Sequence, residues 1–84
     1  MKYLSCEPLL GSLANVNFSG IDWIVVGGEH GPKARIMKEN WVLEIKNKCF
    51  EENIKFFFKQ WGGVQKKKNG RLLQGVEYSE MPIM

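Results

Sequence analysis

The sequence predicts an α/β fold, a small three-stranded and mainly parallel sheet with one crossover helix. Three short apolar segments, 2–6, 22–26 and 54–58, are rich in strand-forming residues and end in polar or turn-forming residues. The second and third contain the continuous apolar runs Ile24–Val26 and Phe56–Phe58. Continuous runs are typical of parallel strands that are covered on both faces.

One amphipathic helix is predicted between the second and third strands, over residues 38–52. Its apolar side chains recur at helical spacing, and they are Trp41, Val42, Ile45 and Cys49. Asn53 suits the end of this helix because asparagine tolerates the left-handed conformation that is common there. A strand, a helix and a strand in this order form a βαβ unit, whose crossover is right-handed.

The remaining segments are predicted to be irregular. The link at 9–21 contains glycine and asparagine residues, so we expect at most a short helical turn. Glycines and three consecutive lysines predict a solvated loop over 62–70, and residues 71–78 a short C-terminal hairpin or loop. With no repeat or internal boundary, residues 1–84 are expected to form a single domain.

Composition and charge limit the class of protein. The chain is 44% hydrophobic and 25% charged, as in ordinary globular domains, and its net charge of +3 permits but does not demand nucleic acid. It has neither the apolar region of a signal peptide nor a run of transmembrane length, so we expect no membrane partner and a cytoplasmic location. Cys6 and Cys49 form no CxxC pair, and two thiols cannot complete a zinc site, so no metal is expected.

Polar residues and glycines follow each predicted strand. Because ligands bind at the carboxyl ends of strands in parallel α/β sheets, these positions are the predicted ligand-binding edge. The candidate residues are Glu7, Gly27, Gly28, Glu29, Arg35, Lys59, Gln60 and Trp61.

The glycine-rich turn 27–31 is expected to favour an anion, through backbone N–H groups and the N-terminus of the following helix. Arg35 would add a bidentate contact. The turn is neither GxGxxG nor a Walker loop, so it does not identify a nucleotide site. The alternative is a tight turn that needs the positive φ that glycine tolerates.

Other candidates also have two interpretations. Glu7 and Glu29 would serve as acid and base or as ligands for an amine, or else as ion partners of Lys59 or Arg35. His30 would be a proton shuttle or simply exposed. The indole of Trp61 would stack on a flat ligand or close the end of the sheet.

The two thiols differ in their predicted surroundings. Cys6, at a strand end, would be a nucleophile only if its thiol were acidified. Cys49 is assigned to the core because it falls on the apolar face of the predicted helix.

Four motifs resemble one known family. They are SCEPLLG at 5–11, GIDWIVVGGEHGPKAR at 20–35, FFFKQWG at 56–62 and RLLQGVEYSEMP at 71–82. In this order they resemble the C-terminal part of a radical-SAM-like, three-Cys-motif protein family of phages and prophages, whose function is unknown.

The resemblance implies a parent fold that is a partial or complete (β/α) barrel, of which this chain would be a fragment. It also implies an iron–sulfur cluster and S-adenosylmethionine as parental cofactors, with the candidate residues lining the barrel mouth. A cluster needs several closely spaced thiolates and this chain has two distant cysteines, so we expect no cofactor in the chain itself.

The resemblance implies a phage-derived protein that contributes strand-end ligand-binding residues, and the lack of a cysteine cluster implies that it is not catalytically complete alone. The alternatives are a stand-alone module for phosphate or nucleic acid, using Arg35, Lys59 and Lys66–Lys68, and a structural remnant without a ligand. The expected partners are a small anion and, to cover the sheet, a second copy or the missing N-terminal part of the barrel.

Overall fold

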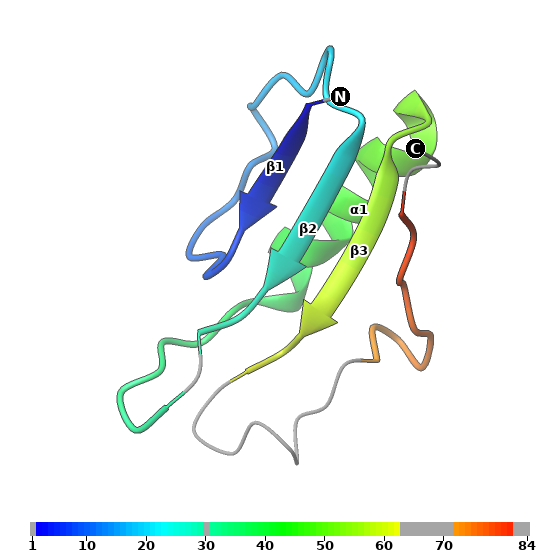
Figure 1. Ribbon diagram of the computed structural model, residues 1–84. Coiled ribbons are helices and arrows are strands. Elements are labelled where there is room, and N and C mark those ends of the chain that lie inside the picture. Colours follow the sequence, from blue (N-terminus) through cyan, green and yellow to red (C-terminus); the bar gives the residue numbers. More distant parts are fainter. Residues whose placement is uncertain (1, 30, 63–71, 82–84) are drawn as a thin grey trace.

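The sheet of the computed structural model contains three parallel strands in the order β1-β2-β3 (Figure 1). The structure describes residues 2–29, 31–62 and 72–81. Its elements are β1 (Tyr3–Cys6), β2 (Trp23–Gly27), α1 (Glu39–Glu52) and β3 (Lys55–Gln60). The predicted α/β fold, with one crossover helix between the second and third strands, is confirmed.

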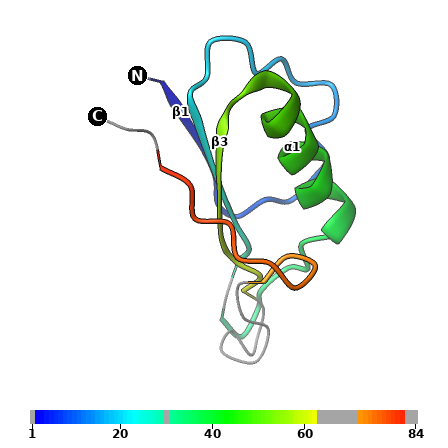
Figure 2. The same cartoon turned by 90° about the vertical axis from the view of Figure 1, so that its right-hand side faces the viewer.

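Only one face of the sheet is covered by the described residues. Helix α1 and the link 9–21 both run over the same face (Figure 2). Side chains along β3 therefore alternate, with Phe56 and Phe58 buried and Phe57 between them only half-buried. The other face is left half-exposed in this part of the chain, and its cover by a second copy or by a further part of the protein stays a prediction. A continuous apolar run also fits a strand with one half-exposed apolar face.

The core lies between the sheet and the layer made by α1 and the link. Its buried side chains are Leu9, Phe18, Ile24, Val26, Met37, Val42, Ile45, Cys49, Ile54, Phe56, Phe58 and Leu73. Cys49 belongs to this core, as predicted. Asn53 ends α1 with φ 57°, and the Ile54 N–H donates to the Cys49 carbonyl oxygen at 2.8 Å, so the predicted helix end is confirmed.

The side chain of Lys48 connects the irregular link 9–21 to α1 by hydrogen bonds. Its Nζ donates to the carbonyl oxygens of Ala14 at 2.7 Å and Val16 at 2.8 Å, and lies 5.0 Å from the centre of the Phe18 ring. The link is free of helix, as predicted, and its carbonyl groups are satisfied by the helix instead. A stretch without regular structure can therefore form part of the second layer.

The C-terminal segment contains the predicted hairpin and continues beyond it. Leu73 and Val76 form an antiparallel bridge around Gln74 and Gly75, both of which have positive φ. Residues 78–80 then run antiparallel along the outer edge of β3. The Phe58 N–H donates to the Tyr78 carbonyl oxygen at 2.8 Å, and the Glu80 N–H donates to the Phe56 carbonyl oxygen at 3.2 Å.

Across the residues that the structure describes, no helix combines the length and the apolar character needed to cross a membrane.

Candidate functional site

The Glu7 carboxylate joins the carboxyl ends of β1 and β3. Its Oε1 accepts a hydrogen bond from Lys59 Nζ at 3.1 Å, and its Oε2 accepts one from Gln60 Nε2 at 3.0 Å. Gly27, at the end of β2, lies beneath this carboxylate, because a Cβ there would come within 3.0 Å of Glu7 Oε2. The structure thus brings four predicted residues together, and glycine leaves the room that the carboxylate needs.

Two glycines allow the turns after β2 and β3 to touch. The Gly28 N–H donates to the Gln60 carbonyl oxygen at 3.0 Å, and a Cβ on Gly28 would lie 1.8 Å from the carbonyl oxygen of Trp61. Gly62 has φ +76°, and a Cβ there would lie 2.5 Å from the Glu29 carbonyl oxygen. Close approach of backbones explains Gly28, whereas positive φ within the described part of the 27–31 turn is found at Gly31.

Glu29 and Arg35 form a bidentate ion pair. Arg35 Nε donates to Glu29 Oε1 at 3.0 Å, Nη2 donates to Oε2 at 2.9 Å, and the Arg35 backbone N–H donates to Oε1 at 2.9 Å. These hydrogen bonds hold the pKa of Glu29 at about 2. Glu29 is therefore an ionised partner of Arg35 near neutral pH, and Glu7 is likewise a partner of Lys59, as the ion-pair interpretation predicted.

Helix α1 does not follow the glycine turn directly. Residues 32–38 separate the glycine turn from Glu39, where the helix begins, and Lys38 provides no side-chain cap. The contribution of the helix N-terminus to an anion site stays a prediction. The loop before the helix folds back on the turn, since the Ala34 N–H donates to the Gly31 carbonyl oxygen and the Arg35 N–H donates to the Glu29 carboxylate.

Trp61 closes the end of the sheet. Its ring packs edge-on against Phe58, with ring centres 5.1 Å apart, and its Nε1 donates to the Leu72 carbonyl oxygen at 2.8 Å. This agrees with the interpretation in which Trp61 covers the sheet end. His30 and Lys66–Lys68 lie outside the described residues.

The site retains cationic groups that face solvent. Side chains of Arg35 and Lys59 are 64% and 51% exposed. The pair with Glu29 uses Arg35 Nε and Nη2, and the pair with Glu7 uses one of the three ammonium protons of Lys59, so donors remain for a ligand. Beside Arg35 lies a hollow of about 390 Å³, lined by Glu29, Gly31, Pro32 and Lys33.

A comparison with protein families identifies the chain. The model of a family described as "Protein of unknown function (DUF5131)" matches residues 1–82. The chain belongs to the DUF5131 family. No curated protein and no solved structure matches it significantly. The stretch that matches the DUF5131 family includes every residue of the candidate site.

The cysteines of this DUF5131 member do not fit an iron–sulfur cluster. Burial raises the pKa of the half-buried Cys6 thiol. Burial, with a smaller contribution from the charge of Glu80, raises the pKa of Cys49 to about 12. A cluster is held by several thiolates, whereas these two thiols are protonated and lie on different elements. Within the described ranges, no group of three or more His, Cys, Asp or Glu residues could hold a metal ion.

Thiol reactivity tests this assignment. In the folded protein at pH 8 we expect Cys49 to resist iodoacetamide, because its thiol is fully buried and protonated, and Cys6 to react slowly. Mass spectrometry of labelled peptides after timed quenching would measure both, with urea-unfolded protein as the control in which both thiols react. Rapid alkylation of Cys49 before unfolding would contradict the structure.

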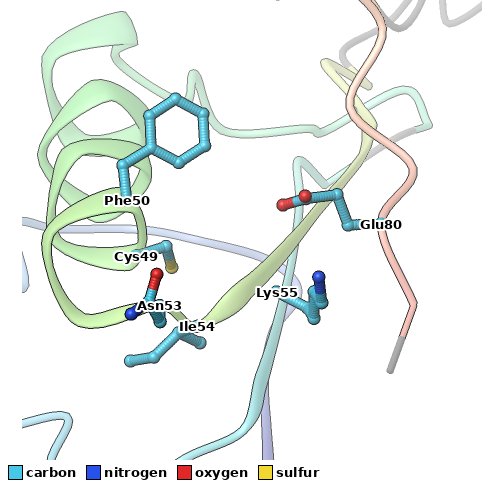
Figure 3. Close-up of a pocket in the computed structure, with 6 residues that line it drawn as sticks. All are labelled: Cys49, Phe50, Asn53, Ile54, Lys55 and Glu80. Atoms are coloured by element: carbon cyan, nitrogen blue, oxygen red, sulfur yellow. The ribbon is translucent and has the colours of Figure 1, made fainter. Parts of the chain in front are cut away.

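Another hollow lies at the opposite end of β3, where α1 ends. It is lined by Cys49, Phe50, Asn53, Ile54, Lys55 and Glu80 (Figure 3). Glu80 Oε1 already accepts the Phe56 N–H at 3.1 Å, so this carboxylate serves the pairing of segment 78–80 with β3. Lys55, which also lines this hollow, is a cation on the same strand as Lys59 but at the opposite end of the sheet.

Proposed function

We propose that the chain supplies a small-anion-binding edge to a radical-SAM-like phage protein of the kind it resembles, and that it completes no catalytic cycle alone. The four quoted motifs support the parentage, and the mismatch between the two cysteines and a cluster supports the incomplete chemistry. We expect the protein to act in the cytoplasm, where free thiols stay reduced.

Two placements carry the proposal: Lys59 lies at the carboxyl end of β3, and Arg35 pairs with Glu29 just after the carboxyl end of β2. Ligands of α/β sheets bind at this edge. Both cations are exposed, and both are oriented by carboxylates, Glu29 and Glu7, that leave part of their donors available. Because the Gly28 N–H already donates to the Gln60 carbonyl oxygen, the Gly31 N–H would complete the contacts to an anion.

The expected affinity is weak. Two exposed charge-assisted contacts in water favour a dissociation constant on the order of millimolar, about 4 kcal/mol of binding free energy. The carboxylates compete with an anion for the same cations, which limits affinity further. Such an edge fits a ligand that other parts of a larger protein also hold.

A phosphate titration followed by amide chemical shifts tests the site. We expect the amides of Gly27, Gly28 and Gly31 to shift with increasing phosphate, because they lie at the end of β2 and in the turn that follows it, at the proposed edge. Arg35→Ala should remove most of the binding, and Lys59→Ala should weaken it. Shifts confined to Lys66–Lys68 would overturn the site and favour the phosphate- or nucleic-acid-binding loop instead.

Lys55→Ala is the matched control. Lys55 and Lys59 are exposed residues of the same strand, and either substitution removes one positive charge, but Lys55 lies at the opposite end of β3. If binding depends on position, only Lys59→Ala weakens it. Equal losses in both variants would show a general charge effect and would contradict the proposed site.

A further inference from the structure

Strand β1 has one unpaired edge. β2 occupies one side of it, and no described segment pairs with the other side. Leu4 and Cys6 direct their backbone groups towards β2, in line with the Lys2 carbonyl oxygen that accepts from the Asp22 N–H at 2.9 Å. The N–H and C=O groups of Tyr3 and Ser5 consequently point outward.

The free edge lacks the features that usually prevent strand addition. β1 contains no proline and no charged residue, and its register with β2 is regular. The edge of β3, in contrast, is paired with residues 78–80. The two edges of the sheet therefore differ: among the described residues, only the edge of β1 is open to a further strand.

Apolar surface lies on both sides of the free edge. On the helix side, a hollow of about 390 Å³ is lined mainly by apolar side chains of β1 and the link, among them Leu4, Leu10 and Val16. On the other face, Tyr3 is 62% exposed, and its ring centre lies 5.6 Å from that of Trp23. A strand added here would bury apolar side chains on both faces as well as pairing its backbone.

We propose that β1 pairs antiparallel with β1 of a second copy of the chain, on a two-fold axis that passes beside Leu4. In this register Tyr3 lies opposite Ser5 of the second copy, and each such pair exchanges two backbone hydrogen bonds. The two Leu4 side chains meet on the helix side, next to the apolar hollow of each copy.

The sequence of β1 favours this register over its symmetric neighbours. Centring the pair on Ser5 would place Tyr3 opposite Glu7, which lies beyond the strand and binds Lys59 and Gln60. Centring on Tyr3 would leave Ser5 opposite a residue before the strand. With Leu4 at the centre, Tyr3 and Ser5 of the two strands pair with each other, Cys6 lies opposite Lys2 of the second copy, and no like charges face each other.

A second copy also satisfies the geometry of the sheet. Because the axis is perpendicular to the sheet, α1 of both copies lies on the same face, and one continuous sheet results. The aromatic side chains Tyr3, Trp23 and Phe57 then form one surface across both copies on the other face. Because the β1 edge of one copy contacts the β1 edge of the other, the interface is complete with two copies.

Light scattering on the purified chain, with two substitutions at one position, tests the proposal. We expect the wild type to show twice the monomer mass of 9.7 kDa at high micromolar concentration. Ser5→Pro removes an outward N–H without removing a bond to β2, and should raise the dissociation constant about tenfold or more. Ser5→Ala keeps the N–H and should remain dimeric. A monomeric wild type, or a folded Ser5→Pro dimer of unchanged affinity, would overturn it.

Hydrogen exchange on the wild type tests the β1 pairing even if the Ser5→Pro variant does not fold. The amides of Tyr3 and Ser5 should become more protected as protein concentration rises, whereas those of Leu4 and Cys6, already bonded to β2, should not change. Concentration-independent exchange at Tyr3 and Ser5 would overturn the pairing.

Disulfide cross-linking tests the register. In a Cys6→Ala background, the Leu4→Cys variant should oxidise to a cross-linked dimer, since paired positions on the axis suit a disulfide. Failure to cross-link would overturn the register.

Discussion

Gly28→Ala is expected to cause the largest loss of stability of any single substitution considered for this chain. The new Cβ would lie 1.8 Å from the carbonyl oxygen of Trp61 and 2.8 Å from its carbonyl carbon. Both are backbone atoms, so no side-chain rotation relieves the clash, and the ends of β2 and β3 must separate. Separation breaks the hydrogen bond from Gly28 to Gln60.

We expect Gly28→Ala to lower the free energy of unfolding by more than about 4 kcal/mol, a large part of the 5–15 kcal/mol typical of a domain. Urea denaturation followed by tryptophan fluorescence measures it. Gly11→Ala is the matched control, because a Cβ on Gly11 meets nothing within 4 Å and its φ is not positive. That variant should change stability by about 0.5 kcal/mol or less. Equal midpoints for the two variants would show that the turns do not touch.

Phe58→Ala is expected to have the second-largest effect. Its side chain is fully buried, and it is packed against the ring of Trp61 at the end of the sheet. Truncation leaves a cavity as well as removing buried apolar surface, which costs about 3–5 kcal/mol. Thermal and urea unfolding should both show the loss, together with a change in the environment of Trp61.

Phe50→Ala provides the comparison for Phe58→Ala. Phe50 lies on α1 and is 52% exposed, with its ring centre 6.1 Å from that of Tyr78. Its truncation leaves no enclosed cavity, so we expect a loss of about 1 kcal/mol. A loss at Phe58 no greater than that at Phe50 would contradict the placement of the core.

The sequence predicts the strands and the helix because burial leaves a local pattern. The apolar runs around Ile24 and Phe56 and the helical spacing of Val42 and Ile45 each identify an element. β3 extends beyond its apolar run to Lys59 and Gln60, since pairing with β2 continues there. The pairing of segment 78–80 could not be predicted, because an edge segment joined by backbone hydrogen bonds needs no apolar pattern.

The candidate site was predictable in position and only partly in its contacts. Parallel topology brings strand ends together, so the convergence of Glu7 and Lys59 follows from the fold alone. The path of the loop 32–38, which decides that Arg35 meets Glu29, depends on tertiary contacts. The hydrogen bonds from Lys48 to the carbonyl groups of the link depend on tertiary contacts in the same way.

Segment 78–80 limits how far this sheet can be extended. It pairs with β3 at the edge of the sheet opposite β1. If two copies join through β1 as proposed, neither copy has an unpaired strand edge left in the described residues, so the assembly would stop at two copies rather than grow into a fibre. Removal of this short segment would leave the sheet with two unpaired strand edges instead of one, and two such edges allow growth into filaments.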